Sequence, residues 1–261
     1  MIPLRLGAVS YLNTKPLVCG LESDPGFAVR FDVPSKCAAL LHAGEVDLGL
    51  IPAIEYLNGD YAIVPDISIA SDGPVATVAV FARTPIERVR RVALDVSSKT
   101  SVALTRILCA KHWGIAPSFV PAEPDLEAML ARADAALVIG DPAFAVDPEA
   151  RGVRKIDLGA EWKAMTGLPF VYAMWTGRPG AATPAQCHML AAARDRGVAH
   201  LPEIARSVGG GDPDLERRSL VYLRDNLKYG LGEGEAAGLR RFHALAAEVG
   251  VVSAVKPLKF F

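Results

Sequence analysis

Short apolar runs alternate with segments of helical periodicity over the first two-thirds of the chain. The apolar runs predict strands, and the stretches between them predict helices. This alternation is typical of an α/β protein. The predicted strands are Leu4–Val9, Ala28–Val33, Val46–Ile51, Ala62–Pro65, Val75–Ala82, Val92–Asp95, Ser118–Val120, Ala135–Ile139, Lys155–Leu158 and Pro169–Trp175. The predicted helices are Pro16–Glu22, Ser35–Ala43, Ala53–Asn58, Thr100–His112, Asp125–Ala133 and Glu161–Thr166.

The pattern becomes helical after Gly177. Amphipathic stretches that end in glycine or glycine-rich turns predict helices within residues 183–208, 212–231 and 233–250. Before this tail, two long strand patterns, "DGPVATVAVFAR" and "LPFVYAMWTGR", bracket a central series of strands and helices. A chain that crosses to a second lobe and then returns would show this arrangement. Clefts between lobes are preferred ligand sites.

Composition narrows the classes of partner. The chain is 51% hydrophobic and 22% charged, with a formal net charge of -1, so it lacks the basic excess that nucleic-acid binding requires. Its N-terminus lacks the features of a signal peptide, and no run is apolar enough to span a membrane. These features predict a cytoplasmic protein without nucleic-acid or membrane partners. The four scattered cysteines fit reduced, buried side chains rather than a metal site.

Polar residues collect after four of the predicted strands. In the group at residues 10–16, Thr14 can cap a helix and Pro16 suits a first helical turn. In the group around Lys99, the free N–H groups at a helix start favour binding of an anion. A cap or a tight turn explains each group alone, but together they predict a pocket for a small acidic molecule. The groups are Ser10 to Pro16, Ser71 to Val78, the hydroxyls Ser97, Ser98, Thr100 and Ser101 around Lys99, and Gly140 with Asp141.

Common catalytic motifs are absent from the sequence. It contains no GxSxG elbow, no GxxxxGK[ST] phosphate loop, no HExxH, and no GxGxxG after the first strand. All five histidines fall within predicted helices or at their ends. The sequence therefore offers no histidine in a strand-end loop as a candidate general base.

Six segments, in order and spacing, resemble the chorismate dehydratases of the futalosine route to menaquinone. They are "SYLNTKP", "GEVDLGLIPAIEYL", "SDGPV", "SSKTSVALTRIL", "DAALVIGDPAF" and "DLGAEWKAMTGLPFVYAMW". The resemblance runs from about residue 4 to residue 178 and continues more weakly through the helical tail. The last two segments are its most specific part. The stretch at residues 44–52 is less specific, because solute-binding proteins in general show similar runs.

The resemblance implies the two-lobed fold of type II periplasmic binding proteins with a helical C-terminal segment. It places residues 1–77 plus 178–261 in lobe I and residues 78–177 in lobe II, with the ligand cleft between them. It also implies removal of water from chorismate to give 3-[(1-carboxyvinyl)oxy]benzoate, with no cofactor and no metal.

The same resemblance assigns direct roles to Asn13 and Thr77. It implies a stepwise mechanism in which the enolpyruvyl carboxylate of the substrate takes the proton. The family often has Ser where this chain has Thr77, and the extra methyl restricts χ1 while the hydroxyl is kept. Further expected substrate contacts are Ser10, Tyr11, Ser97, Ser98, Thr100 and Ser101, with Gly140 and Asp141 as pocket wall.

Other functions remain compatible with this pattern. A non-catalytic binding protein for a small carboxylate would have the same fold. The sibling enzyme that makes 1,4-dihydroxy-6-naphthoate relies on a histidine base and a different opening motif. A regulatory ligand-sensing domain is a third alternative, and a DNA-binding helix pair ahead of residue 1 would be needed to support it.

Overall fold

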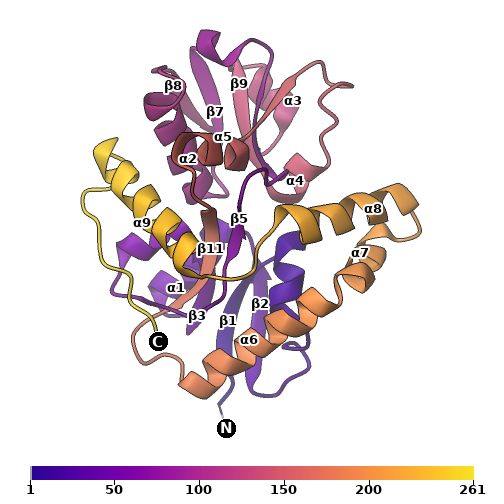
Figure 1. Ribbon diagram of the computed structural model, residues 1–261, viewed down its shortest axis with the longest axis vertical. Coiled ribbons are helices and arrows are strands. Elements are labelled where there is room, and N and C mark those ends of the chain that lie inside the picture. The colour runs from indigo at the N-terminus through magenta and orange to yellow at the C-terminus, as the bar shows by residue number, and fades with distance from the viewer. Residues whose placement is uncertain (1) are drawn as a thin grey trace.

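The computed structural model describes residues 2–261 and consists of two α/β lobes (Figure 1). The first lobe is built on a six-stranded sheet with the order β2-β1-β3-β11-β4, to which β5 is added by pairing with β11. The second lobe is built on a five-stranded sheet with the order β10-β6-β9-β7-β8. Both termini lie in the first lobe (Figure 1).

The strands have the following bounds. The first sheet contains β1 (Leu4–Val9), β2 (Phe27–Asp32), β3 (Leu48–Pro52), β4 (Ala62–Ile63), β5 (Ile69–Ser71) and β11 (Phe170–Gly177). The second contains β6 (Val78–Ala82), β7 (Arg91–Asp95), β8 (Ser118–Ala122), β9 (Ala135–Ile139) and β10 (Arg154–Asp157). The pairs β1–β2, β1–β3, β7–β8 and β7–β9 are parallel, whereas β11 and β6 pair antiparallel to their neighbours.

The helices and short helical turns connect and cover the sheets. They are η1 (Leu12–Val18), α1 (Pro34–Ala43), η2 (Ala53–Asn58), η3 (Ile86–Arg88), α2 (Lys99–Lys111), α3 (Leu126–Leu130), α4 (Gly140–Phe144), α5 (Leu158–Thr166), α6 (Pro184–Ala199), α7 (Leu201–Gly209), α8 (Pro213–Val221), the π-helical turn η4 (Tyr222–Asn226) and α9 (Glu233–Glu248). Helix α9 packs against β11 of the first lobe and against α2 of the second.

The expected α/β class and two-lobed fold are confirmed, but several local predictions are wrong. Strand β6 starts only at Val78, because the preceding residues form a tight crossover. The helix expected at Pro16–Glu22 is a 3₁₀ segment that begins at Leu12. The helix expected within residues 183–208 is broken before Leu201, because Pro202 cannot donate an N–H inside a continuous helix.

The predicted lobe boundary also differs from the structure, because the prediction placed residues 78–177 in lobe II. Strand β11 pairs with β3, β4 and β5, so it belongs to the first sheet, and the chain returns to that lobe between α5 and β11. All eight residues of β11 are buried. Because β11 lies inside the sheet rather than at its edge, it carries the apolar side chains of both faces.

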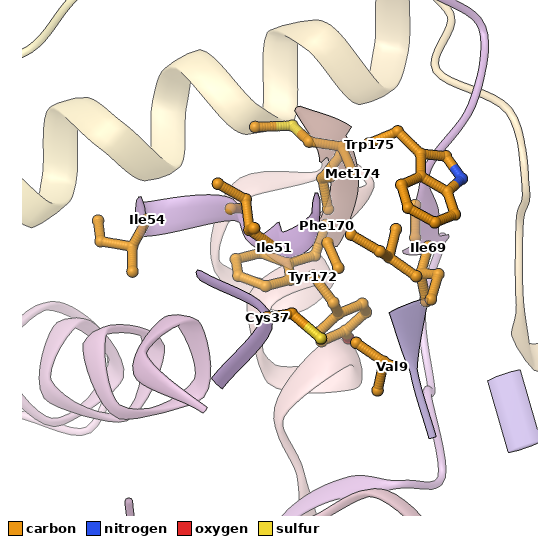
Figure 2. Packing of buried hydrophobic residues seen from close by; sticks show 14 of the residues in the cluster. Val9, Cys37, Ile51, Ile54, Ile69, Phe170, Tyr172, Met174 and Trp175 are labelled. Carbon is orange, nitrogen blue, oxygen red and sulfur yellow. The ribbon is translucent and has the colours of Figure 1, made fainter. Parts of the chain in front are cut away.

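The returning strand is fixed by aromatic packing. The ring of Phe170 lies 5.1 Å from that of Trp162 on α5 and 5.0 Å from that of Phe242 on α9, both in edge-on orientation. Figure 2 shows the β11 side chains packed near Ile51 of β3 and Ile69 of β5. Such edge-on pairs add to the free energy gained by burial. One continuous core therefore joins α5, β11 and α9.

Candidate active site

The segment after β1 forms one wall of a cavity between the lobes. The backbone N–H of Leu12 donates to Asp141 Oδ1 of α4 at 3.1 Å, so a carboxylate of the second lobe caps η1. Thr14, expected to be the cap, instead lies inside η1 with 1% of its surface exposed and donates to Asn13 Oδ1 at 3.4 Å. Asp141 thus joins the lobes, and it is not among the residues that line the cavity.

Asn13 and Thr77 meet at one tyrosine hydroxyl. Asn13 Nδ2 donates to the Tyr222 hydroxyl at 3.1 Å, and Thr77 Oγ1 lies 2.9 Å from the same oxygen. Thr77 and Tyr222 are 1% and 2% exposed. Burial raises the pKa of Tyr222 above its ordinary range, although the bonds from Thr77 and Asn13 oppose that rise. The phenol therefore stays protonated near neutral pH.

The crossover that presents Thr77 is held by β10. Asp157 accepts from the backbone N–H groups of Val75, at 3.0 Å, and of Ala76, at 2.6 Å. Lys155 Nζ donates to the carbonyl oxygen of Ala76 at 2.6 Å. Ala76 has φ +67°, a left-handed conformation that is unfavourable for a residue with a Cβ. The contacts on both sides of Ala76 therefore fix the backbone just before Thr77.

The hydroxyl cluster at the start of α2 is divided between the cavity and the lobe junction. Ser98 and Ser101 line the cavity, and their hydroxyls lie 3.1 Å apart. Thr100 Oγ1 instead accepts from the backbone N–H of Ile54 at 3.1 Å. The carbonyl oxygen of Ser97 accepts from the backbone N–H of Ser35 at 3.0 Å. Neither Thr100 nor Ser97 is among the residues that line the cavity.

An ion pair outside the cavity also joins the lobes. Glu55 is 1% exposed, and its carboxylate lies 2.7 Å from Lys99 Nζ at the start of α2 and 2.6 Å from His42 Nε2. Burial raises the pKa of Glu55, but the bonds from Lys99, His42 and Asn58 outweigh that effect, and the pKa lies below its ordinary value. This carboxylate is therefore charged at neutral pH.

Gly140 has a conformation that few other residues could adopt. Its φ is +64°, and a Cβ at this position would lie 2.6 Å from the ring of Tyr11. Its backbone N–H donates to the carbonyl oxygen of Thr77 at 2.8 Å. The glycine therefore lets the Tyr11 ring approach the backbone closely, and it ties the start of α4 to the crossover.

The cavity between these segments has a volume of about 50 Å³. All of the described residues that line it are uncharged, and none is a histidine. They are Val9, Tyr11, Asn13, Pro34, Pro52, Ile69, Val75, Thr77, Val78, Ser98, Ser101, Ile139, Gly140, Tyr172 and Ala173. Ser10 lies outside, in a larger pocket of about 640 Å³ that shares Val9 and Tyr11 with the cavity.

Tyr222 and Tyr172 were missed from the sequence. The Tyr172 hydroxyl lies 3.0 Å from Ser71 Oγ. In the sequence Tyr172 belongs to an apolar strand pattern, where an aromatic residue suggests core packing. Tyr222 falls in the helical stretch "RRSLVYLRDN", where it reads as one more residue of the apolar face. No local sequence signal distinguishes these tyrosines, because their partners lie about 100 or more positions away in the chain.

The two sheets and the cavity between them define a protein with the periplasmic-binding-protein fold. The periplasmic aliphatic sulphonate binding protein SsuA from Escherichia coli has a TM-score of 0.68 to this chain, at 18% identity, and the match covers 100% of this chain and 94% of that one. Among residues 2–261, no helix has the length and apolar character needed to cross a bilayer.

The chain belongs to the family described as menaquinone biosynthesis, whose model matches residues 4–248. A chorismate dehydratase from Thermus thermophilus is 34% identical over 93% of this chain and 94% of the relative. Another chorismate dehydratase, from Campylobacter jejuni, is 29% identical over 65% of this chain and 66% of that protein. The family resemblance noted in the sequence is therefore confirmed.

Proposed function

We propose that this protein is a chorismate dehydratase that converts chorismate into 3-[(1-carboxyvinyl)oxy]benzoate for menaquinone biosynthesis. The observation that carries the proposal is the meeting of Asn13 and Thr77 at one buried hydroxyl, beside an uncharged cavity between the lobes. Similarity to chorismate dehydratases over nearly the whole chain supports the choice of substrate.

The reaction is an elimination and makes the protein a hydro-lyase. The bond from C4 to its hydroxyl oxygen breaks, the proton leaves C3, and the electrons of the C–H bond complete a benzene ring as water departs. The balance needs no oxidant, reductant or cofactor. Because aromatisation makes the reaction favourable, the protein must mainly hold one substrate conformation and exclude competing reactions.

The uncharged cavity suits a mechanism in which the substrate supplies its own base. In this proposal the enolpyruvyl carboxylate takes the C3 proton, the Thr77 hydroxyl donates to the leaving C4 oxygen, and the Asn13 side chain orients the substrate. The lack of histidine among the described lining residues supports this reading over the sibling 1,4-dihydroxy-6-naphthoate synthase.

The start of α2 is the expected site for a substrate carboxylate. The side chains of Ser98 and Ser101 line the cavity there, and the N-terminus of a 13-residue helix carries partial positive charge. Hydroxyls and helix N–H groups can bind a dianion without placing a fixed countercharge next to the leaving hydroxyl.

Substrate entry requires the lobes to separate. The cavity of about 50 Å³ is far smaller than the roughly 300 Å³ or more of typical small-molecule sites. We propose that the lobes move about two crossings, one near residue 77 and one between α5 and β11. Opening would break the contacts of Asp141 with Leu12 and of Lys99 with Glu55. We place the activity in the cytoplasm, where a biosynthetic enzyme of this family would meet chorismate.

The test is turnover of chorismate by the purified protein. Loss of the diene absorbance with a mass decrease of one water is expected, and Asn13→Ala should abolish turnover without changing the circular dichroism spectrum. Tight chorismate binding with no turnover would instead favour a non-catalytic binding protein of the same fold. Wild-type rates in Asn13→Ala would remove Asn13 from the mechanism.

A further inference from the structure

We propose that Tyr222 is a positioning residue that sets the direction of the Thr77 hydroxyl proton. Tyr222 comes from the helical tail and reaches the site from η4, a π-helical turn directly after α8. Such π-helical irregularities are frequent at functional sites. The inference deepens the proposed function and rests on it for its kinetic test.

The direction of the Tyr222 proton follows from its two partners. The Asn13 side-chain amide nitrogen can only donate, so it fills one lone pair of the phenol oxygen. The phenol proton then has one acceptor among residues 2–261, Thr77 Oγ1 at 2.9 Å. If Thr77 donated instead, the phenol proton would be buried without a partner, which costs free energy. Tyr222 therefore donates to Thr77.

This assignment leaves the Thr77 proton free for the substrate. Thr77 Oγ1 already accepts from Tyr222, and Thr77 lines the cavity. Its own O–H is therefore available to donate into the cavity, toward the position of a leaving hydroxyl. The raised pKa of Tyr222, caused by burial, keeps the phenol protonated and the direction fixed.

Tyr222 also contacts the second lobe. Its ring centroid lies 5.3 Å from that of Phe144 on α4, and Arg218 of α8 donates to the carbonyl oxygen of Phe144 at 2.7 Å. The tail helix therefore touches both Asn13 of the first lobe and α4 of the second. The hydrogen bonds that set the direction of the Thr77 hydroxyl proton therefore lie where the two lobes meet.

The matched pair of variants is Tyr222→Phe and Tyr229→Phe. Both tyrosines are buried, at 2% and 7% exposure, but the Tyr229 hydroxyl has no hydrogen-bond partner in the described part of the chain. Tyr222→Phe should lower kcat by roughly tenfold to a hundredfold with KM changed less than about threefold, because the lost orientation matters in the transition state. Tyr229→Phe should keep the wild-type kcat.

A double variant separates positioning from general damage. In a Thr77→Val background there is no hydroxyl to orient, so adding Tyr222→Phe should lower kcat by no more than about threefold. A loss as large as in the wild-type background, or equal losses in Tyr222→Phe and Tyr229→Phe, would overturn the proposal. So would a wild-type kcat in Tyr222→Phe.

A second readout does not depend on turnover. In ¹⁵N-labelled protein the Asn13 side-chain amide, assigned by its disappearance in Asn13→Asp, should exchange slowly with solvent in the wild type and in Tyr229→Phe. It should exchange faster in Tyr222→Phe. Unchanged exchange in Tyr222→Phe would refute the hydrogen-bond network itself. A wild-type protein with protected Asn13 and no turnover would instead count against the proposed function.

Discussion

The substitution Asp157→Asn tests whether the crossover before Thr77 is held by a carboxylate. Asp157 accepts four backbone N–H groups: those of Val75 and Ala76 in the crossover, and those of Gly159 and Ala160 at the start of α5. Asparagine keeps one acceptor oxygen and replaces the other with an amide nitrogen that cannot accept. With its oxygen toward α5, the new amide would face the N–H of Ala76.

The expected loss follows from the contacts that asparagine cannot make. Leaving one backbone donor unpaired, together with the loss of a charge-assisted bond, costs about 2 kcal/mol of unfolding free energy. Urea denaturation followed by tryptophan fluorescence measures this loss. The turnover number should fall as well, because Ala76 with φ +67° directly precedes Thr77.

Asp125→Asn is the matched control. Asp125 caps α3 by accepting the single backbone N–H of Ala128, and asparagine caps a helix about as well as aspartate. Its unfolding free energy should stay within about 0.5 kcal/mol of the wild type. Equal stability of Asp157→Asn and Asp125→Asn would show that the Asp157 carboxylate does not hold the crossover.

Three further predictions concern Thr77, Gly140 and His243. Thr77→Ser should retain turnover within about threefold, whereas Thr77→Val should lose about a hundredfold in kcat; equal rates would mean that the hydroxyl is idle. Gly140→Ala should lower both thermal stability and turnover more than Gly152→Ala, because both glycines have positive φ but only a Cβ at Gly140 would meet the Tyr11 ring; equal effects would exclude that clash. Burial lowers the pKa of His243 to about 4 from its ordinary 6.5, so the unfolded chain binds more protons between these values and stability must fall as the pH is lowered. Between pH 7 and pH 5 this group should lower the unfolding free energy by about 2 kcal/mol, as measured by denaturation at both pH values. The decrease should be smaller in His243→Gln, and equal decreases in both proteins would refute the prediction.

The periodicity of the sequence predicted those helices and strands whose formation depends on local sequence rather than on contacts with distant residues. Leu4–Val9 and Ala135–Ile139 form strands at the predicted bounds, because short, largely apolar runs of that length suit buried strands; Arg5 is the one exposed residue of Leu4–Val9. Asp125 caps α3 and Ser98 caps α2, and each is a residue type that favours the N-cap position at the start of a helical pattern. Local chemistry was sufficient for these features.

Features decided by distant residues could not be predicted in this way. Thr14 was expected to cap the first helical segment, but Asp141, from a different lobe, takes that role. Thr100 was expected to contact a ligand, but its hydroxyl accepts from the backbone N–H of Ile54 in the first lobe. A sequence pattern shows that a side chain can donate or accept a bond, and only the fold determines which partner is near.

One labelling experiment identifies the bond of chorismate that the protein breaks. Chorismate carrying ¹⁸O in its C4 hydroxyl is incubated with the purified protein, and the products are analysed by mass spectrometry and proton NMR. The expected product is a benzoate that retains the enolpyruvyl ether, with the label lost to water. Release of pyruvate, or unchanged chorismate at stoichiometric protein, would contradict it.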